Sequence, residues 1–172
     1  MKHLKYSGMA VLLIVTIIIG GCSMHPKIKA NDSYARIKPV APLPEYERMK
    51  VPHNLSIVVE NVADMNNSYK NRVRLYVNKY EIEPDEIFNY KSSYKYNMKL
   101  QPGIYEIKAL YYAHTGWKES SFTIKPRDRV KIYLNKKATL NVTLKKNHWG
   151  APVDKVTYFE LDYEDIDLNK SQ

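Results

Sequence analysis

The sequence predicts an all-β protein, an antiparallel β-sandwich of about seven to eight strands that follows a cleaved signal peptide and an extended proline-containing tether. Three observations lead to this prediction. Apolar and polar residues alternate with a period of two over most of the chain after Asn54. Turn signals built from Pro, Gly and Asn separate the alternating segments. The alternating segments are also rich in β-branched and aromatic residues, which favour strands.

Residues 1–21 have the layout of a secretory signal peptide. Two lysines precede an apolar run from Met9 to Ile19, and two small glycines end the segment at Gly21. Even when flanking glycines are included, the run holds about 14 residues, whereas a membrane-spanning helix needs roughly 18 to 20. We therefore expect cleavage rather than permanent spanning.

The only cysteine of the chain, Cys22, follows directly. The residues Ile19 to Cys22, IGGC, resemble the lipobox of bacterial lipoprotein precursors. This resemblance implies cleavage between Gly21 and Cys22, a diacylglycerol on the Cys22 sulfur, and an N-acyl chain such as palmitate on the new amino group. Two or three acyl chains anchor a protein stably, at about 0.8 kcal/mol per buried methylene. The alternative is an ordinary signal peptide followed by an unmodified cysteine.

The residue after Cys22 bears on the location of the protein. In the lipoprotein family, Asp at this position favours retention at the inner membrane in many Gram-negative species, and here the residue is Ser23. The resemblance thus implies an outer-membrane lipoprotein that faces the periplasm, with the inner membrane and the cell surface left open. A lipidated Cys22 leaves no thiol for disulfides or metal binding.

Residues 22–53 are expected to form the lipidated N-terminus and an extended tether, because prolines and scattered charges interrupt every period. At about 3.1 Å per residue such a tether would reach at most roughly 90 Å from the bilayer. The alternative is that part of it, such as KPVAPLP (38–44), lies along the domain as a docked strand or coil.

The sandwich is expected over residues 54–163, with an acidic flexible tail at 164–172. The expected strands are LSIVVENV (55–62), RVRLYV (72–77), SYKYNMKL (93–100), IYEIKALYY (104–112), SSFTI (120–124), VKIYLN (130–135), ATLNVTLK (138–145) and KVTYFELDY (155–163). One segment, EPDEIFNY (83–90), is predicted to be helical, because Pro84 can open a helix with acidic residues in its first turn.

A longer segment, 72–144, resembles the PEGA-type and transthyretin-like sandwich modules of bacterial envelope proteins. The matching residues are Leu100, Pro102, Gly103, Tyr105, Ile107, Gly116, Trp117, Phe122 and Ile124, preceded by the hairpin RLYVNKYEI. In the turn, Pro102 fixes φ and Gly103 accepts a positive φ. The chain departs from the family in having Asn78-Lys79 where the family has Asp-Gly, and in lacking its Thr-Pro pair.

Charge is distributed unevenly along the chain. The net charge of +9 becomes +7 when Lys2 and Lys5 leave with the signal peptide. Basic residues dominate 118–146 and acidic residues dominate the chain from Asp154 onward. The basic part suits an acidic partner, anionic lipid or cell-wall polymer, or alternatively forms a solvated face whose lysines protect sheet edges. Nucleic acid is not expected as a partner of an exported, lipid-tethered chain.

No pattern in the sequence indicates an enzyme. The histidines lack metal-ligand spacing, a Gly-x-Ser-x-Gly elbow is absent, and the acidic DYEDID segment (162–167) lacks the glycine and terminal glutamate of an EF-hand loop. We therefore expect no catalytic residues, no bound metal and no cofactor other than the covalent lipid.

Tyrosine is abundant, with 15 residues in the chain, and an exposed group of tyrosines can bind a protein or stack on sugars. Tyr111, Tyr112, Trp117 and Tyr133 are the candidate binding surface. The alternative is that the tyrosines cover a half-buried sheet, with the ring on the core and the hydroxyl in water.

These features together predict a non-catalytic, lipid-anchored adaptor that binds or supports a periplasmic or outer-membrane protein assembly. One alternative is a module that binds cell-wall polysaccharide through exposed Tyr and Trp. Another is an outer-membrane lipoprotein of a secretion system, because the type VI apparatus has lipoproteins with a similar layout of lipobox, tether and sandwich.

Overall fold

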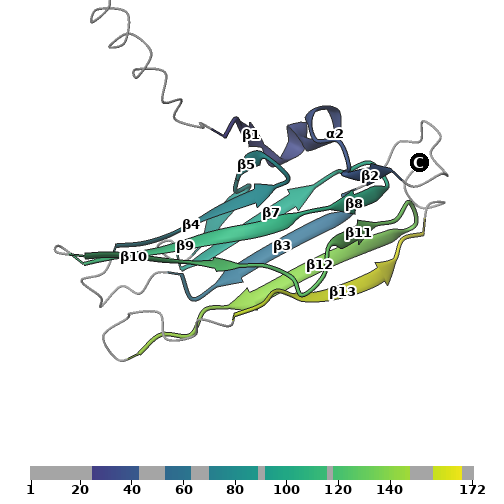
Figure 1. Cartoon of the computed structure of the whole chain (residues 1–172). Coiled ribbons are helices and arrows are strands. Elements are labelled where there is room, and N and C mark those ends of the chain that lie inside the picture. The colour runs from purple at the N-terminus through teal and green to yellow at the C-terminus, as the bar shows by residue number, and fades with distance from the viewer. Residues whose placement is uncertain are drawn as a thin grey trace, which may run out of the picture.

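The computed structural model describes residues 25–42, 53–62, 70–88, 92–115, 118–147 and 157–167. Over these residues the protein is an all-β sandwich, which confirms the predicted fold class (Figure 1). The described helices are short: the 3₁₀ turn η2 (Ala30–Asp32) and α2 (Ser33–Arg36). The predicted signal peptide, the predicted lipidation site at Gly21 and Cys22, and Trp117 lie outside the described residues.

Two five-stranded sheets and one three-stranded sheet build the fold. The first sheet contains, in spatial order, β1 (Lys27–Lys29), β5 (Tyr80–Glu83), β4 (Lys70–Val77), β9 (Ile107–Thr115) and β10 (Lys118–Ile124). The second contains β13 (Glu160–Asp165), β12 (Lys136–Thr143), β3 (Leu55–Glu60), β7 (Ser93–Met98) and β6 (Glu86–Phe88). The third contains β11 (Val130–Ile132), β8 (Gly103–Tyr105) and β2 (Ala41–Pro42).

The core consists of the residues that alternate inward along the strands. In the first sheet Leu75, Ala109 and Ile124 are fully buried, and in the second sheet Ile57 and Leu140 are fully buried. Each Leu or Ile side chain that leaves water stabilises the fold by roughly 1.5 to 3 kcal/mol. The period of two in the sequence therefore marked the buried face correctly.

The number and direction of the strands differ from the prediction. The described residues contain thirteen strands, because short strands form in the N-terminal segment and IYEIKALYY divides into β8 and β9 at Glu106. Most neighbours are antiparallel, as predicted, but β1 pairs with β5 and β3 pairs with β12 in parallel. The acidic tail also begins later than predicted, because residues 164 and 165 belong to β13.

The helix predicted at 83–90 is wrong for the described residues, since 86–88 form the strand β6. Asp85 fixes this segment against β7: its N–H donates to the carbonyl of Lys95 at 3.0 Å, and its carboxylate accepts from the N–H of Asn97. Ile87 then pairs with Tyr94 in the sheet. Hydrogen bonding to an existing strand outweighs the weak helical preference of so short a segment.

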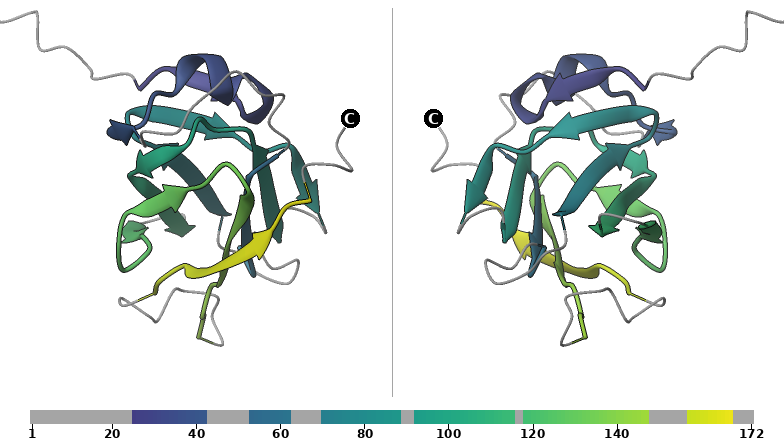
Figure 2. Two further views of the ribbon diagram at one scale, coloured as in Figure 1. Left: turned by 90° about the vertical axis from the view of Figure 1, so that its right-hand side faces the viewer. Right: turned by 90° about the vertical axis from the view of Figure 1, so that its left-hand side faces the viewer.

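The prediction of an extended tether is also wrong over residues 25–42, because these residues pack against the sandwich. Ile28 and Ile37 are buried in the core, and the Ser33 hydroxyl donates to the carbonyl of Lys99 at 2.8 Å. Figure 2 shows this segment, in purple and blue, on the side of the molecule opposite β13, in yellow. Burial of its apolar side chains explains the docking, and the docked alternative is correct for Ala41 and Pro42, which form β2.

Candidate functional site

The predicted tyrosine surface is not assembled as expected, because Tyr111 is fully buried. Alternation along β9 puts Tyr111 on the core face with Ile107 and Ala109. Its ring packs edge-to-face on Phe122 with centroids 5.1 Å apart, and its hydroxyl donates to the Val62 carbonyl at 3.4 Å. Burial raises the pKa of Tyr111 above its ordinary value. Tyr111 is therefore a core residue and not part of a binding surface.

Tyr112 lies on the opposite, outer face of the first sheet, where it is half-buried. The guanidinium carbon of Arg72 lies 4.8 Å from the centre of the Tyr112 ring, and that of Arg74 lies 5.6 Å from it. Contacts of this kind between cations and aromatic faces are each worth roughly 0.5 to 2 kcal/mol. The Tyr112 ring is thus covered in part by the side chains of Arg72 and Arg74.

Tyr133 has a third, different environment. It follows β11, is half-buried, and packs edge-to-face on Tyr163 of β13 with ring centroids 5.6 Å apart. The ammonium nitrogen of Lys131 lies 5.1 Å from the centre of the Tyr133 ring, and the Tyr163 hydroxyl donates to the Lys131 carbonyl at 2.9 Å. The contacts of Tyr133 are therefore to β11 and β13 rather than to Tyr112.

A polar cluster that the sequence analysis missed surrounds Tyr76, on the outer face of the first sheet. Tyr76 is only 4% exposed, because the rings of His25 and Tyr76 pack with centroids 5.2 Å apart and Lys108 lies over it. Glu81 accepts from the Tyr76 hydroxyl at 3.5 Å and lies 3.5 Å from the Lys27 ammonium. Burial raises the pKa of Tyr76, and the side-chain hydrogen bond between Arg74 and Tyr76 raises the pKa of Arg74.

Two adjoining hollows lie near the Asn78–Lys79 turn. The first has a volume of about 540 Å³ and lies between the N-terminal segment and the turn; the second, of about 310 Å³, lies between the turn and the loop 125–129. Asn78, Glu106 and Lys108 line both hollows. The basic residues that line them, here called the cationic band, are Arg36, Lys38, Lys79, Lys108, Lys125, Arg127 and Arg129.

Asn78 holds the parts of the cationic band together. Its amide donates to the Lys38 carbonyl at 2.7 Å, and its side-chain oxygen accepts from the Glu106 N–H at 3.0 Å. Asn78 also adopts a φ of 51°, a conformation that Asn tolerates better than most residues. Among the described residues, the acidic residues that line the hollows are Glu106 and Asp128, and Glu106 pairs with Arg129 at 2.8 Å.

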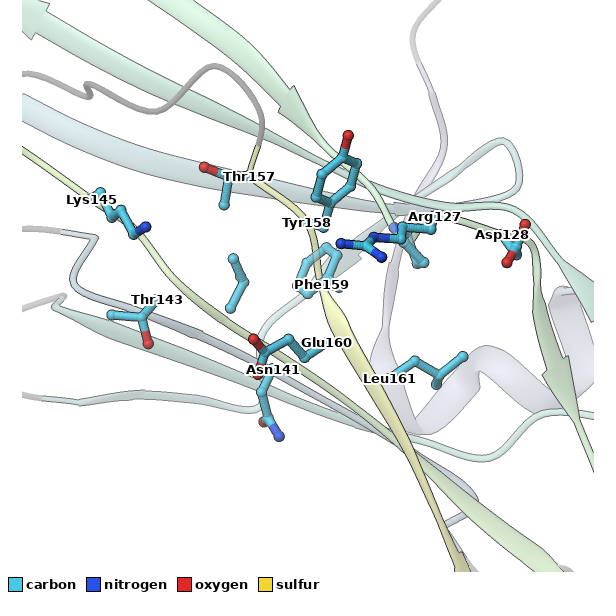
Figure 3. A pocket seen from close by; sticks show the side chains of 12 residues that line it. Arg127, Asp128, Asn141, Thr143, Lys145, Thr157, Tyr158, Phe159, Glu160 and Leu161 are labelled. Carbon is cyan, nitrogen blue, oxygen red and sulfur yellow. The ribbon is translucent and has the colours of Figure 1, made fainter.

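A larger cavity of about 660 Å³ lies between β12, the loop at 126–128 and the chain at 157–161 (Figure 3). Figure 3 shows Arg127 directed toward Tyr158, whose ring centre lies 5.3 Å from the guanidinium carbon. Asn141, Thr143, Lys145 and Glu160 also line it. The cavity is lined by side chains of both charges and by several hydrogen-bonding groups. It shares the described lining residues Pro126, Arg127 and Asp128 with the second hollow.

An apolar edge forms the remaining candidate site. Among the residues that the structure describes, β6 is the last strand at one edge of the second sheet, and two adjacent apolar residues on it, Ile87 and Phe88, are 49% and 44% exposed. Strand edges of soluble proteins usually carry charges or prolines, because an open apolar edge invites another strand. The sequence analysis missed this site because it assigned the segment to a helix.

Some kinds of site are absent from the described part of the chain. No group of three or more His, Cys, Asp or Glu side chains there is placed to hold a metal ion. Among the same residues, no helix has the length and apolar character needed to cross a bilayer. Comparisons of the chain with protein-family models, with curated proteins and with solved structures found no match.

Proposed function

We propose that this protein is a non-catalytic lipoprotein of the cell envelope, anchored through lipid on Cys22 in the outer membrane and facing the periplasm, where it acts as an adaptor for another protein. The anchor is supported by the IGGC segment at the end of an apolar run too short to span a bilayer. Family resemblance supplies the lipid chemistry at Cys22, and the covalent lipid is the only cofactor that the proposal requires.

The observation that carries the adaptor role is the open apolar edge at β6. An extended segment of a partner protein can add to this edge as a further strand, with main-chain hydrogen bonds supplying affinity. Ile87 and Phe88 lie on opposite faces of the strand because successive side chains alternate. An added strand would therefore contact Ile87 on one side and Phe88 on the other, and apolar residues at matching positions would give specificity.

The polysaccharide alternative has less support. It needs Tyr111, Tyr112 and Trp117 on one surface, and Tyr111 is buried on the face opposite Tyr112. The secretion-system alternative depends on a layout with a tether, and residues 25–42 pack on the sandwich instead. Both alternatives nevertheless make distinct predictions in the experiment below.

The lipid anchor is tested by growing cells with an alkyne analogue of palmitate. The native chain is expected to incorporate the label, Cys22→Ser is expected to lose it, and Ser23→Ala is the control that keeps it. An unmodified thiol at Cys22 in the native mature protein, measured by mass spectrometry, would contradict the anchor.

The adaptor role is tested by a photocrosslinking amino acid introduced in living cells at Phe88, at Tyr112 or at Asp162. Asp162 is the control, because it is an exposed residue of β13. We expect one discrete protein adduct from position 88 and none from position 162. Adducts of wall glycan at position 112, with none at 88, would support the polysaccharide alternative instead, and adducts to secretion-apparatus proteins would support the third.

A further inference from the structure

The cationic band lies beside the point where the folded chain meets the proposed anchor. His25, the first described residue, lines the first hollow together with Arg36, Lys38 and Lys79. Only three residue steps separate His25 from Cys22. Because an extended chain spans at most about 3.6 Å per residue, the backbone of a lipidated Cys22 is held within about 11 Å of the backbone of His25, at the rim of this hollow. A lipid anchor at Cys22 therefore keeps this hollow near the headgroup layer, which is about 5 to 8 Å thick on each side of the hydrocarbon core.

The charge of the two hollows is strongly one-sided. In the part of the chain that the structure describes, seven basic and two acidic side chains line them, which gives a formal net charge of +5. Within the described residues, neither Arg36, Lys38 nor Lys79 forms a salt bridge with a carboxylate. These three side chains come from two segments, the end of α2 with the residues after it and the β4–β5 turn, which the Asn78 contact with Lys38 brings together.

An apolar residue lies among these charges. Val40 lines the first hollow and is 51% exposed, the largest exposed fraction among the large hydrophobic residues that the structure describes. A basic surface with an exposed apolar residue suits the interface of a membrane, where phosphates lie beside the first methylenes. The docking of residues 25–42 on the sandwich removes the reach that an extended tether would provide, so the domain is held at the bilayer.

We propose that the cationic band binds the phosphate groups of anionic phospholipids in the membrane that carries the anchor, and thereby fixes the orientation of the domain on the bilayer. This inference rests on the lipid anchor of the proposed function. β13 lies on the side of the molecule opposite the N-terminal segment (Figure 2), so the end of the band formed by Arg36, Lys38 and Lys79 would face the lipid while β13 would face away from it. The proximity of the band to Cys22 favours lipid over an acidic protein as its occupant.

The test uses the native lipidated protein with one added cysteine as the site for a polarity-sensitive fluorophore. If the Cys22 sulfur carries lipid, the added cysteine is the only free thiol, since the sequence contains a single cysteine. Val40→Cys reports on the band, and Asp162→Cys on β13 is the control. Each labelled protein is inserted into vesicles of phosphatidylcholine alone or with phosphatidylglycerol added.

We expect the emission at position 40 to shift to shorter wavelength on the vesicles that contain phosphatidylglycerol, and the shift to be reversed by salt. Position 162 is expected to give the same emission on both kinds of vesicle. Arg36→Gln, Lys38→Gln and Lys79→Gln together should lower the ratio of docked to undocked protein on the order of 100-fold, because each basic residue near an anionic surface contributes about 1 kcal/mol. The matched control combines Lys95→Gln, Lys99→Gln and Lys137→Gln, three lysines outside the hollows, and should keep the shift.

The inference would be overturned if position 40 gave equal emission on both kinds of vesicle while the Cys22 sulfur did not react with the fluorophore. The lipid anchor would then still stand. Retention of the shift after the three band substitutions would also overturn the inference. A response of position 40 to polyglutamate, without any response to phosphatidylglycerol, would show that the band binds acidic protein. Attachment of the fluorophore to Cys22 in the unsubstituted protein would instead overturn the anchor, and the docking with it.

Discussion

The Asn54 side chain forms two hydrogen bonds with the backbone of Leu100. The Asn54 amide nitrogen donates to the Leu100 carbonyl at 2.7 Å, and the Asn54 side-chain oxygen accepts from the Leu100 N–H at 2.8 Å. Both residues are fully buried. The Asn54 backbone also bonds to Met98 and Ala138, so this residue joins the ends of β3, β7 and β12.

Asn54→Ala is therefore expected to destabilise the domain by about 2 to 4 kcal/mol, because it leaves the N–H and the carbonyl of Leu100 buried without partners. Unfolding in urea, followed by circular dichroism, measures the change. Asn141→Ala, at an exposed position of β12, is the matched control and should change stability by less than about 0.5 kcal/mol. Equal unfolding midpoints for the two variants would contradict the role of Asn54.

Two buried tyrosines should respond in opposite ways to loss of the hydroxyl. The Tyr105 hydroxyl donates to the Gln101 carbonyl at 2.7 Å, whereas the Tyr96 hydroxyl is buried and meets no hydrogen-bond partner among the described residues. Tyr105→Phe should cost about 1 to 2 kcal/mol, and Tyr96→Phe should be neutral or stabilise by about 1 kcal/mol. Thermal unfolding of both variants decides the matter, and a less stable Tyr96→Phe protein would count against it.

Alkaline pH should destabilise the protein. Burial raises the pKa of Tyr94, Tyr96 and Tyr111 in the folded state, while tyrosines of the unfolded chain titrate near pH 10. The unfolded chain therefore loses these protons first, so the stability that they contribute is complete below about pH 10 and declines as the pH rises above it. Urea midpoints measured from pH 8 to pH 11 should fall only in the upper part of that range, and Tyr96→Phe should reduce the slope. A midpoint that stays constant across the range would be inconsistent with the raised pKa values.

Gly103 should not tolerate a side chain. It has a φ of 157°, and a Cβ added there would lie 2.8 Å from Cγ of Pro39 and 2.9 Å from the Ala41 carbonyl oxygen. Gly103→Val is expected to cost at least about 2 kcal/mol and to detach the β2 segment from β8. Thermal unfolding and limited proteolysis at 39–42 measure the two effects.

Ile104→Val is the control for Gly103→Val, because it changes the neighbouring residue of the same strand and should cost about 0.5 to 1.5 kcal/mol at most. Residues 39–42 should stay resistant to protease in this control. An unchanged melting temperature for Gly103→Val would refute the close contact between Gly103 and Pro39.

The candidate sites were less predictable than the strands. Alternation within β9 is enough to put Tyr112 on the face opposite the aliphatic residues and Tyr111 in the core, as the structure has them. The cationic band, by contrast, combines residues from four separate parts of the sequence, around positions 36–38, 79, 108 and 125–129. No local pattern marks such a site, because its members are neighbours only after the sheets have formed.

The sequence by itself determined most of the strands of the sandwich and which face of each of these strands is buried, because backbone pleating turns a period of two into two faces wherever a strand lies. Only the tertiary structure decided that β3 and β12 pair in parallel, that residues 25–42 pack on the domain, and that EIF at 86–88 is a strand. These outcomes depend on hydrogen bonds and buried area between segments far apart in the chain. Their free energy exists only once the partner segment is in place, so no local preference records it.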